Sequence, residues 1–152
     1  MARWTLDIGG YAERAGARIR NVRRAFLYAL YSSIVGRTPV DTGRARGNWQ
    51  VSAGSPRTRV LRRTLRGPMP ENAMPEPSGD EPMYIANNLP YISVLEFGGY
   101  PDPVKRGTRT GRGRYERRSE RGFSRQAPQG MVGVTLAGAD RLLEAAVRSA
   151  GR

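Results

Sequence analysis

Apolar side chains recur every three or four residues through the first third of the chain, which is the spacing of one face of an α-helix. The positions are Tyr11, Ala15, Ile19, Val22, Phe26, Leu30 and Ile34. Gly36 and Pro39 then supply helix-ending signals. The pattern predicts a helix over about residues 9–35, roughly 39 Å long. That is more than a domain of this size needs to cover its core, so we expect part of the stripe to face another subunit.

Two short segments have the alternating or β-rich pattern of strands. Residues 47–52 alternate polar and apolar side chains and place Trp49 and Val51 on one face. Residues 83–88 form a second β-rich run that ends before Pro90. The apolar run at 91–97, closed by Gly98 and Gly99, is short enough to be one or two turns of helix.

The C-terminal segment again has helical spacing, and it predicts a helix over about residues 131–148. The apolar positions are Val132, Leu136, Ala139, Leu143 and Val147. Gly133 and Gly138 weaken the first half of this pattern, where the β-branched pair Val134–Thr135 leaves a strand possible.

Together these elements predict an α+β fold in a single domain of residues 1–152. A long N-terminal helix and a C-terminal helix pack on a small, mainly antiparallel sheet, and two long extended loops complete the chain. Six prolines keep residues 55–82 out of long helices and central strands, apart from a possible short element near 60–65. This loop carries an arginine-rich half and an acidic half, which can pair within the chain or between copies. The second loop, at 100–125, is rich in Gly and Arg.

The amino-acid composition limits the kinds of catalysis and metal binding that the chain can support. The 152 residues include no His and no Cys, which removes the commonest general base, thiol chemistry and the usual soft metal ligands. The only carboxylates close in sequence, Glu76, Asp80 and Glu81, lie in the proline-rich loop and are expected to be a solvated charge run. We therefore expect no catalytic residue, no cofactor and no metal. The chain also lacks an apolar run long enough to span a bilayer, so no membrane partner is expected.

The net charge of +13 indicates an acidic partner or nucleic acid. The second loop carries nine basic and three acidic residues, and it has too little apolar surface to offset the cost of ordering the backbone. Seven arginines of this segment are the candidate partner-binding residues: Arg106, Arg109, Arg112, Arg114, Arg117, Arg118 and Arg121. The favoured interpretation is an arm that packs on an acidic neighbour. The alternative is a nucleic-acid-binding arm in which Tyr100, Tyr115 and Phe123 stack on bases.

Three segments in series resemble a known family. They are residues 38–44 (TPVDTGR), 87–99 (NNLPYISVLEFGG) and 124–132 (SRQAPQGMV). In order and spacing, following a long N-terminal helix, they are similar to the tail-completion, or neck, proteins of long-tailed bacteriophages. The resemblance spans about residues 10–148, and the proline-rich loop and the Arg-Gly arm depart from shorter relatives.

The resemblance implies a structural virion protein that is assembled in the bacterial host cytoplasm and located at the head–tail junction. It would form a ring with copies of itself, of six subunits by this likeness, between the head connector or stopper and the tail terminator or tube, with genomic DNA passing through the lumen. No enzymatic activity is implied.

The motif residues of this family pattern are Pro39, Asp41, Gly43, Tyr91, Glu96, Phe97, Gly98 and Pro128. Asp41 and Gly43 are expected to form a tight turn. Tyr91, Leu95 and Phe97 are expected to pack the short helix on the long one. Glu96 is expected to meet an arginine.

Overall fold

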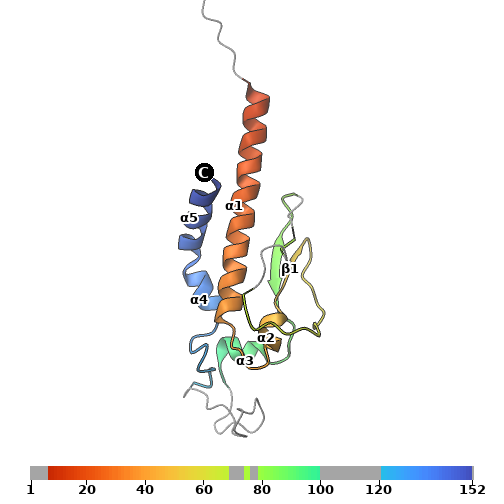
Figure 1. The fold of residues 1–152 in the computed structure, drawn as a ribbon, viewed down its shortest axis with the longest axis vertical. Helices are drawn as coiled ribbons and strands as arrows, with labels where there is room; N and C mark the ends of the chain where they lie inside the picture. The colour runs from red at the N-terminus through yellow and green to blue at the C-terminus, as the bar shows by residue number, and fades with distance from the viewer. Residues whose placement is uncertain (1–6, 69–73, 76–78, 100–120, 152) are drawn as a thin grey trace, which may run out of the picture.

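The computed structural model describes residues 7–68, 74–75, 79–99 and 121–151. Its elements are α1 (Ile8–Arg37), α2 (Arg44–Gly47), β1 (Gln50–Ala53), β2 (Met83–Ala86), α3 (Ile92–Phe97), α4 (Val132–Ala137) and α5 (Ala139–Ala150). Helix α1 is the central element, with α4 and α5 on one side and the sheet on the other (Figure 1). The predicted α+β class, with long N-terminal and C-terminal helices and a small antiparallel sheet, is confirmed.

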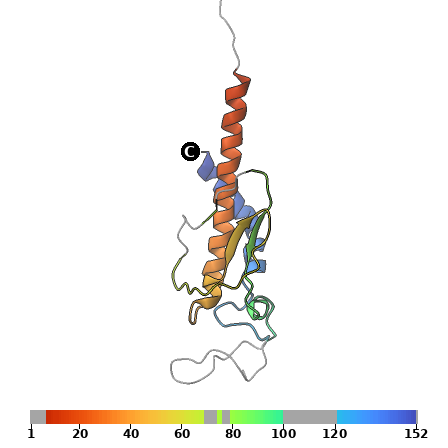
Figure 2. The same ribbon diagram turned by 90° about the vertical axis from the view of Figure 1, so that its right-hand side faces the viewer.

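Helix α1 runs for 30 residues, about 45 Å at the usual rise. The carboxylate of Asp7 caps its start by accepting a hydrogen bond from the Gly10 N–H at 2.9 Å. Its buried positions, Leu27, Tyr31, Ile34 and Val35, all lie in the C-terminal half. The N-terminal end of the helix extends well beyond the other elements, as the two perpendicular views show (Figures 1 and 2).

The predicted apolar stripe of α1 is therefore only partly a core stripe. Ile34 is buried, whereas Tyr11 and Ile19 are 68% and 66% exposed. The periodicity located the helix correctly. It also predicted that the first turns of the helix face the core, which is wrong, because the rest of the domain packs mainly on the later turns.

The sheet consists of β1 and β2, paired antiparallel with Gln50 opposite Ala86 and Ala53 opposite Met83. The predicted first strand began too early, since Gly47 ends α2 and Asn48 caps that helix. The placement of Trp49 and Val51 on the core side is confirmed, because Trp49 is buried and Val51 packs against the core. No regular element occupies residues 60–65, so the possible short element there is absent from the described structure.

The C-terminal helix is broken into α4 and α5 at Gly138. Glycine has the weakest helix preference apart from proline, which explains the break at this position. The strand alternative for its first half is wrong, because residues 132–137 are helical. Thr135 and Ala146 are the buried positions, whereas Leu136, Leu143 and Val147 of the predicted stripe are exposed.

The core lies where the C-terminal half of α1 meets residues from most of the chain. Its buried members outside α1 are Ala45, Trp49, Met74, Leu89, Leu95, Ala127 and Met131. Met74 is contributed by the proline-rich loop, and Ala127 and Met131 come from the segment that leads into α4. The proline-rich loop and the segment that leads into α4 are therefore tied to the same core as the sheet and α3.

Gly43 allows a close crossing of two segments. Its φ of +82° lies in the left-handed region, and a Cβ there would come within 2.7 Å of the Leu65 carbonyl oxygen. The Gly43 carbonyl also accepts a hydrogen bond from the Leu65 N–H at 2.9 Å. The predicted role of Gly43 as a turn residue is confirmed, with the added requirement that the proline-rich loop must approach its Cα.

We predict that Gly43→Ala lowers the free energy of unfolding by about 3 kcal/mol, because both the backbone conformation and the Leu65 contact are lost. Gly54 provides the control, since it has a φ of +75° with no atom within 4 Å of the added Cβ. Gly54→Ala should cost only the backbone strain, about 1 kcal/mol. Urea unfolding of both variants measures the difference, and equal losses would contradict the role of the crossing.

Candidate protein–protein interface and its anchoring network

A buried polar network fixes the end of α1. The Thr38 hydroxyl donates to the Ile34 carbonyl at 2.7 Å and accepts from the Trp49 indole N–H at 2.8 Å. The Tyr31 hydroxyl donates to the Trp49 carbonyl at 2.9 Å, and Arg63 donates to that same carbonyl at 3.1 Å. Buried polar groups are costly unless they are paired, so these bonds hold the exit of α1, the start of β1 and the proline-rich loop in one arrangement.

Burial raises the pKa of the Tyr31 phenol above its ordinary value of 10.0, and the Arg63 guanidinium partly offsets that rise. The folded chain thus holds this proton more tightly than the unfolded chain does. Folding stability from Tyr31 is fully present below pH about 10 and is lost as the pH rises toward the folded pKa.

The turn after α1 is stabilised by a different side chain from the one predicted. The Thr42 hydroxyl accepts a hydrogen bond from the Arg44 N–H at 3.3 Å, whereas the exposed Asp41 makes no such bond within the described residues. A threonine two residues before a backbone N–H can form this turn as an aspartate does. The turn itself was predicted correctly, and the side chain assigned to it was wrong.

Glu96 holds the start of α4. One of its carboxylate oxygens accepts the N–H groups of Met131 and Val132, and the other accepts that of Gly133, each at 2.8 Å. These are N–H groups of the first turn, which have no partner inside their own helix. The predicted partner of Glu96, an arginine, is therefore wrong: the carboxylate is taken up by backbone donors at a helix N-terminus, where negative charge is favoured.

A side-chain amide joins the same segment to the turn after α1. Gln126 accepts a hydrogen bond from the Val40 N–H at 2.8 Å and donates to the Val40 carbonyl at 3.0 Å. These two hydrogen bonds resemble the paired backbone bonds between neighbouring β-strands. Through Gln126 and Glu96, the segment at 124–132 is bonded to both of the other two segments that carry the family resemblance.

The end of α3 requires glycine. Gly98 has a φ of +76°, and a Cβ there would meet the Arg121 carbonyl oxygen at 2.6 Å and the Phe123 ring at 3.0 Å. Gly99 donates to the Arg121 carbonyl at 3.0 Å. The two ends of the Arg-Gly loop are thus held together beside α3.

Packing of α3 follows only part of the prediction. Leu95 is buried and Tyr91 packs against the core, as expected. Phe97 is 78% exposed, so its predicted place in the core is wrong. It belongs to the last turn of a six-residue helix, and Gly98 turns the chain away directly after it. Pro128 is also exposed, in the turn that precedes α4.

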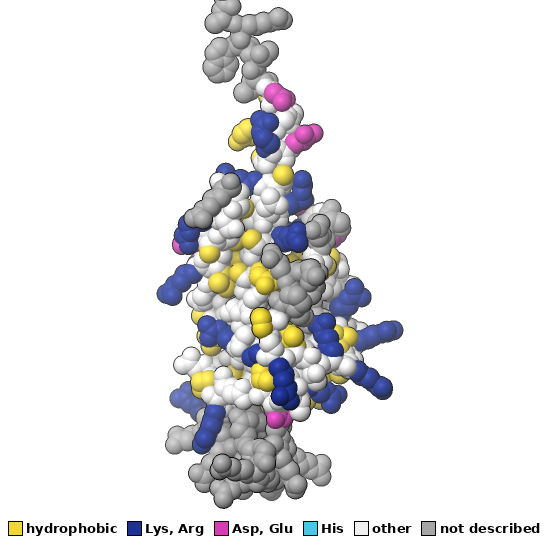
Figure 3. Space-filling view, in the orientation of Figure 1, with side chains coloured by type: hydrophobic (Ala, Val, Ile, Leu, Met, Phe, Trp, Pro, Cys, Tyr) yellow, Lys and Arg dark blue, Asp and Glu magenta, His cyan; other side chains and the backbone are white. Residues whose placement is uncertain are grey.

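Two apolar surfaces are left uncovered within the described residues. The first lies on the projecting half of α1 and includes Ile8, Tyr11 and Ile19. The second lies on α4 and α5 and includes Leu136, Leu143 and Val147. Figure 3 shows apolar side chains scattered over the face in view, among many Lys and Arg side chains and few acidic ones. Separate apolar surfaces on one subunit are what a head-to-tail interface between copies needs.

The predicted partner-binding arginines lie almost wholly outside the described residues. Arg106, Arg109, Arg112, Arg114, Arg117 and Arg118 fall in the part of the chain that is not described. Arg121 is described and exposed, and its backbone carbonyl closes the loop as stated above.

Three side chains of the anchoring network were not singled out from sequence: Gln126, Arg63 and Arg46. The Arg46 guanidinium donates to the carbonyls of Gly36, Thr38 and Arg66 at 2.8–3.1 Å. All three side chains bind backbone carbonyls or N–H groups of distant segments, and such pairing leaves no periodic signal in one sequence.

Within the described ranges, no group of three or more acidic residues could hold a metal ion. No described helix has the length and apolar character needed to cross a membrane. Comparisons of the chain with protein-family models, with curated proteins and with solved structures find no match.

We predict that Glu96→Gln lowers the free energy of unfolding by about 2–3 kcal/mol, since an amide NH₂ would face one of the three N–H donors and the negative charge is lost. Glu144→Gln is the matched control, because Glu144 makes only an exposed pair with Arg148 at 3.6 Å. That control should change stability by less than about 0.5 kcal/mol. Chemical denaturation measures both, and equal small effects would contradict the anchor.

We also predict that stability declines above pH about 10 in a way that depends on Tyr31. The variant Tyr31→Phe should lose about 1 kcal/mol at neutral pH and show a smaller further decline at alkaline pH. An identical decline in the native chain and the Tyr31 variant would contradict the raised pKa.

Proposed function

We propose that this chain is a structural virion protein of a tailed bacteriophage, a tail-completion or neck subunit. In this proposal it forms a ring with copies of itself, of six subunits, between the head connector or stopper and the tail terminator or tube. Genomic DNA passes through the lumen, and assembly takes place in the host cytoplasm. The subunit has no catalytic role.

The observation that supports the proposal is the bonding among the three family-like segments. More than forty residues separate the first segment from the second, and about twenty-five separate the second from the third. Gln126 nevertheless joins the third segment to the first, and Glu96 joins the third to the second. Short motifs that match by chance have no reason to meet in the fold. Their contact indicates that they form one structural unit, as members of one inherited scaffold would.

The uncovered apolar surfaces supply the second support. A closed ring needs one patch of each subunit to meet a different patch of the next. The projecting half of α1 and the outer side of α4 and α5 are two such patches, on different elements of the subunit.

We expect the double variant Tyr11→Gln/Ile19→Gln to fold normally and to fail to assemble, because it removes apolar surface from α1 without adding charge. Arg14→Gln/Arg20→Gln is the matched control on the same helix, and it should still enter the particle. The mass of the assembled particle, as a multiple of the 16.8 kDa chain, measures assembly and copy number. Assembly of both variants alike would contradict the role of α1.

Limited trypsin digestion tests whether the Arg-Gly arm takes part in assembly. Isolated subunits should be cut within residues 106–125, and the same bonds should be protected in the assembled particle. Equal cutting in both states would contradict a role for the arm in assembly.

The competing function is a nucleic-acid-binding protein that uses the Arg-Gly arm. Its support is the net charge of +13. Such a protein would bind duplex DNA tightly, with an affinity that falls steeply with salt, whereas a neck subunit should bind DNA only weakly and without sequence preference.

A further inference from the structure

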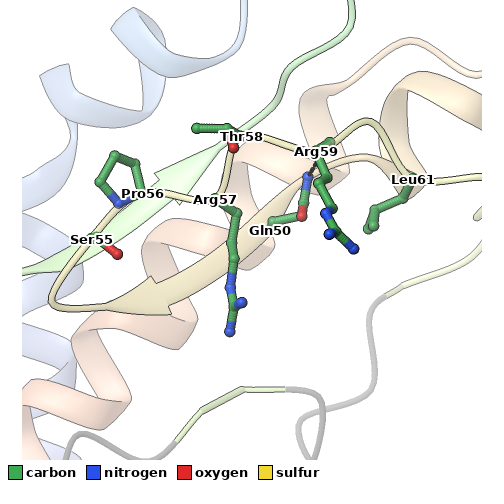
Figure 4. A pocket seen from close by; sticks show the side chains of 7 residues that line it. All are labelled: Gln50, Ser55, Pro56, Arg57, Thr58, Arg59 and Leu61. Atoms are coloured by element: carbon green, nitrogen blue, oxygen red, sulfur yellow. Dashed lines mark hydrogen bonds between the residues drawn. The ribbon is translucent and has the colours of Figure 1, made fainter.

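A basic hollow lies beside β1, away from the segments that support the assembly proposal. Its volume is about 430 Å³, and Gln50, Ser55, Pro56, Arg57, Thr58, Arg59 and Leu61 line it. The segment at 55–61 crosses beside the sheet without joining it (Figure 4). The described part of the lining contains no acidic residue.

The backbone of this segment is held by amide side chains. Gln50 donates to the Arg59 carbonyl at 2.7 Å, and Asn88 donates to the Arg57 carbonyl at 2.8 Å. Asn48 accepts the Leu61 N–H at 2.7 Å. The carbonyl groups are thus turned toward the sheet, and the segment is fixed before any ligand arrives, which lowers the entropic cost of binding.

The two arginines of the hollow point to the same side of the segment (Figure 4). In an extended backbone, residues two apart share a side and lie about 7 Å apart. Both side chains are exposed, and within the described residues neither guanidinium has a hydrogen bond or an ion pair. By contrast, Arg23, Arg46 and Arg63 all donate to backbone carbonyls. Arg57 and Arg59 therefore lie on an anchored backbone, and their guanidinium groups are left available to another molecule.

We propose that Arg57 and Arg59 form a sequence-independent binding site for the phosphodiester backbone of nucleic acid. Guanidinium groups bind phosphate oxygens through paired N–H donors, and contacts of this kind position a protein on nucleic acid without reading its sequence. Arg62 and Arg66 follow later in the same segment and add to its positive charge. Two cations on one side of an anchored backbone fit a polyanion with regularly spaced charges better than they fit a single small anion.

The net charge favours nucleic acid over a second copy of the chain. Each copy brings a further +13, so a second copy adds net repulsion, whereas nucleic acid supplies the opposite charge. The backbone of the described acidic stretch is held against α1, because Arg23 donates to the carbonyls of Gly79 and Glu81. The proposal goes beyond the assembly role and does not rest on it.

The test compares Arg57→Ala/Arg59→Ala with the charge-matched control Arg20→Ala/Arg141→Ala in the full chain. Fluorescence anisotropy with a short duplex DNA gives the affinity as a function of salt. Each phosphate contact contributes about 0.9 to the slope of log K against log salt, so the site variant should lower the slope by about 2 and weaken binding roughly tenfold or more at ~0.1 M salt. The control should change both quantities much less. The backbone anchors use carbonyl and amide groups that alanine retains, and circular dichroism checks that both variants fold.

A second measurement identifies the occupant directly. Arginine modification by a phenylglyoxal reagent, read by mass spectrometry, should be slowed at Arg57 and Arg59 by duplex DNA and not by a polyglutamate peptide. Equal affinity of the two double variants would overturn the proposal. So would protection of these arginines by polyglutamate or by self-assembly alone, which would assign the hollow to an acidic protein segment. Failure of the α1 variants to affect assembly would leave this result unchanged.

Discussion

The pairing of buried polar groups around Trp49 is the constraint on which the rest of the fold depends. At this point α1 ends, β1 begins and the proline-rich loop returns. The three meet through the Thr38 hydroxyl, the Trp49 indole and carbonyl, the Tyr31 hydroxyl and the Arg63 guanidinium. Each of these groups would cost free energy if it were buried alone. Their mutual satisfaction fixes the exit direction of the chain from α1, and the sheet lies beside the helix while α3 lies beneath its C-terminal end (Figure 1).

A second set of hydrogen bonds, made by Glu96 and Gln126, fixes the segment that leads into the C-terminal helices. Glu96 and Gln126 act on backbone groups rather than on other side chains, so they set the position of a whole segment. Arginines contribute in the same way, since Arg46 and Arg63 bind carbonyls of loops that have no regular hydrogen-bond ladder. Part of the large positive charge is thus structural, and Arg57 and Arg59 stand out because they are positioned but uncommitted within the described chain.

The sequence predicted the elements better than their contacts. Periodicity located α1, α3 and both strands to within a few residues, because local patterning determines them. It wrongly predicted that Tyr11 packs in the core, whereas Tyr31 is the buried tyrosine of α1. Which of the two is buried depends on how far the remaining chain reaches along the helix. The partners of Glu96 and the exposure of Phe97 were missed for the same reason: each depends on segments that are distant in sequence. The sequence could not decide whether Asp41 or Thr42 stabilises the turn after α1, because both side chains can accept a backbone N–H two residues on.

We propose that the C-terminal part of α1 builds the subunit and that its exposed N-terminal half packs on a partner in the assembled particle. Hydrogen–deuterium exchange measured residue by residue along α1 tests it most directly. In the isolated subunit, amides from about residue 27 onward should be strongly protected and those before about residue 20 should exchange rapidly; in the assembled particle both halves should be protected. Uniform protection along α1 in the isolated subunit, or rapid exchange of its first half after assembly, would contradict the account.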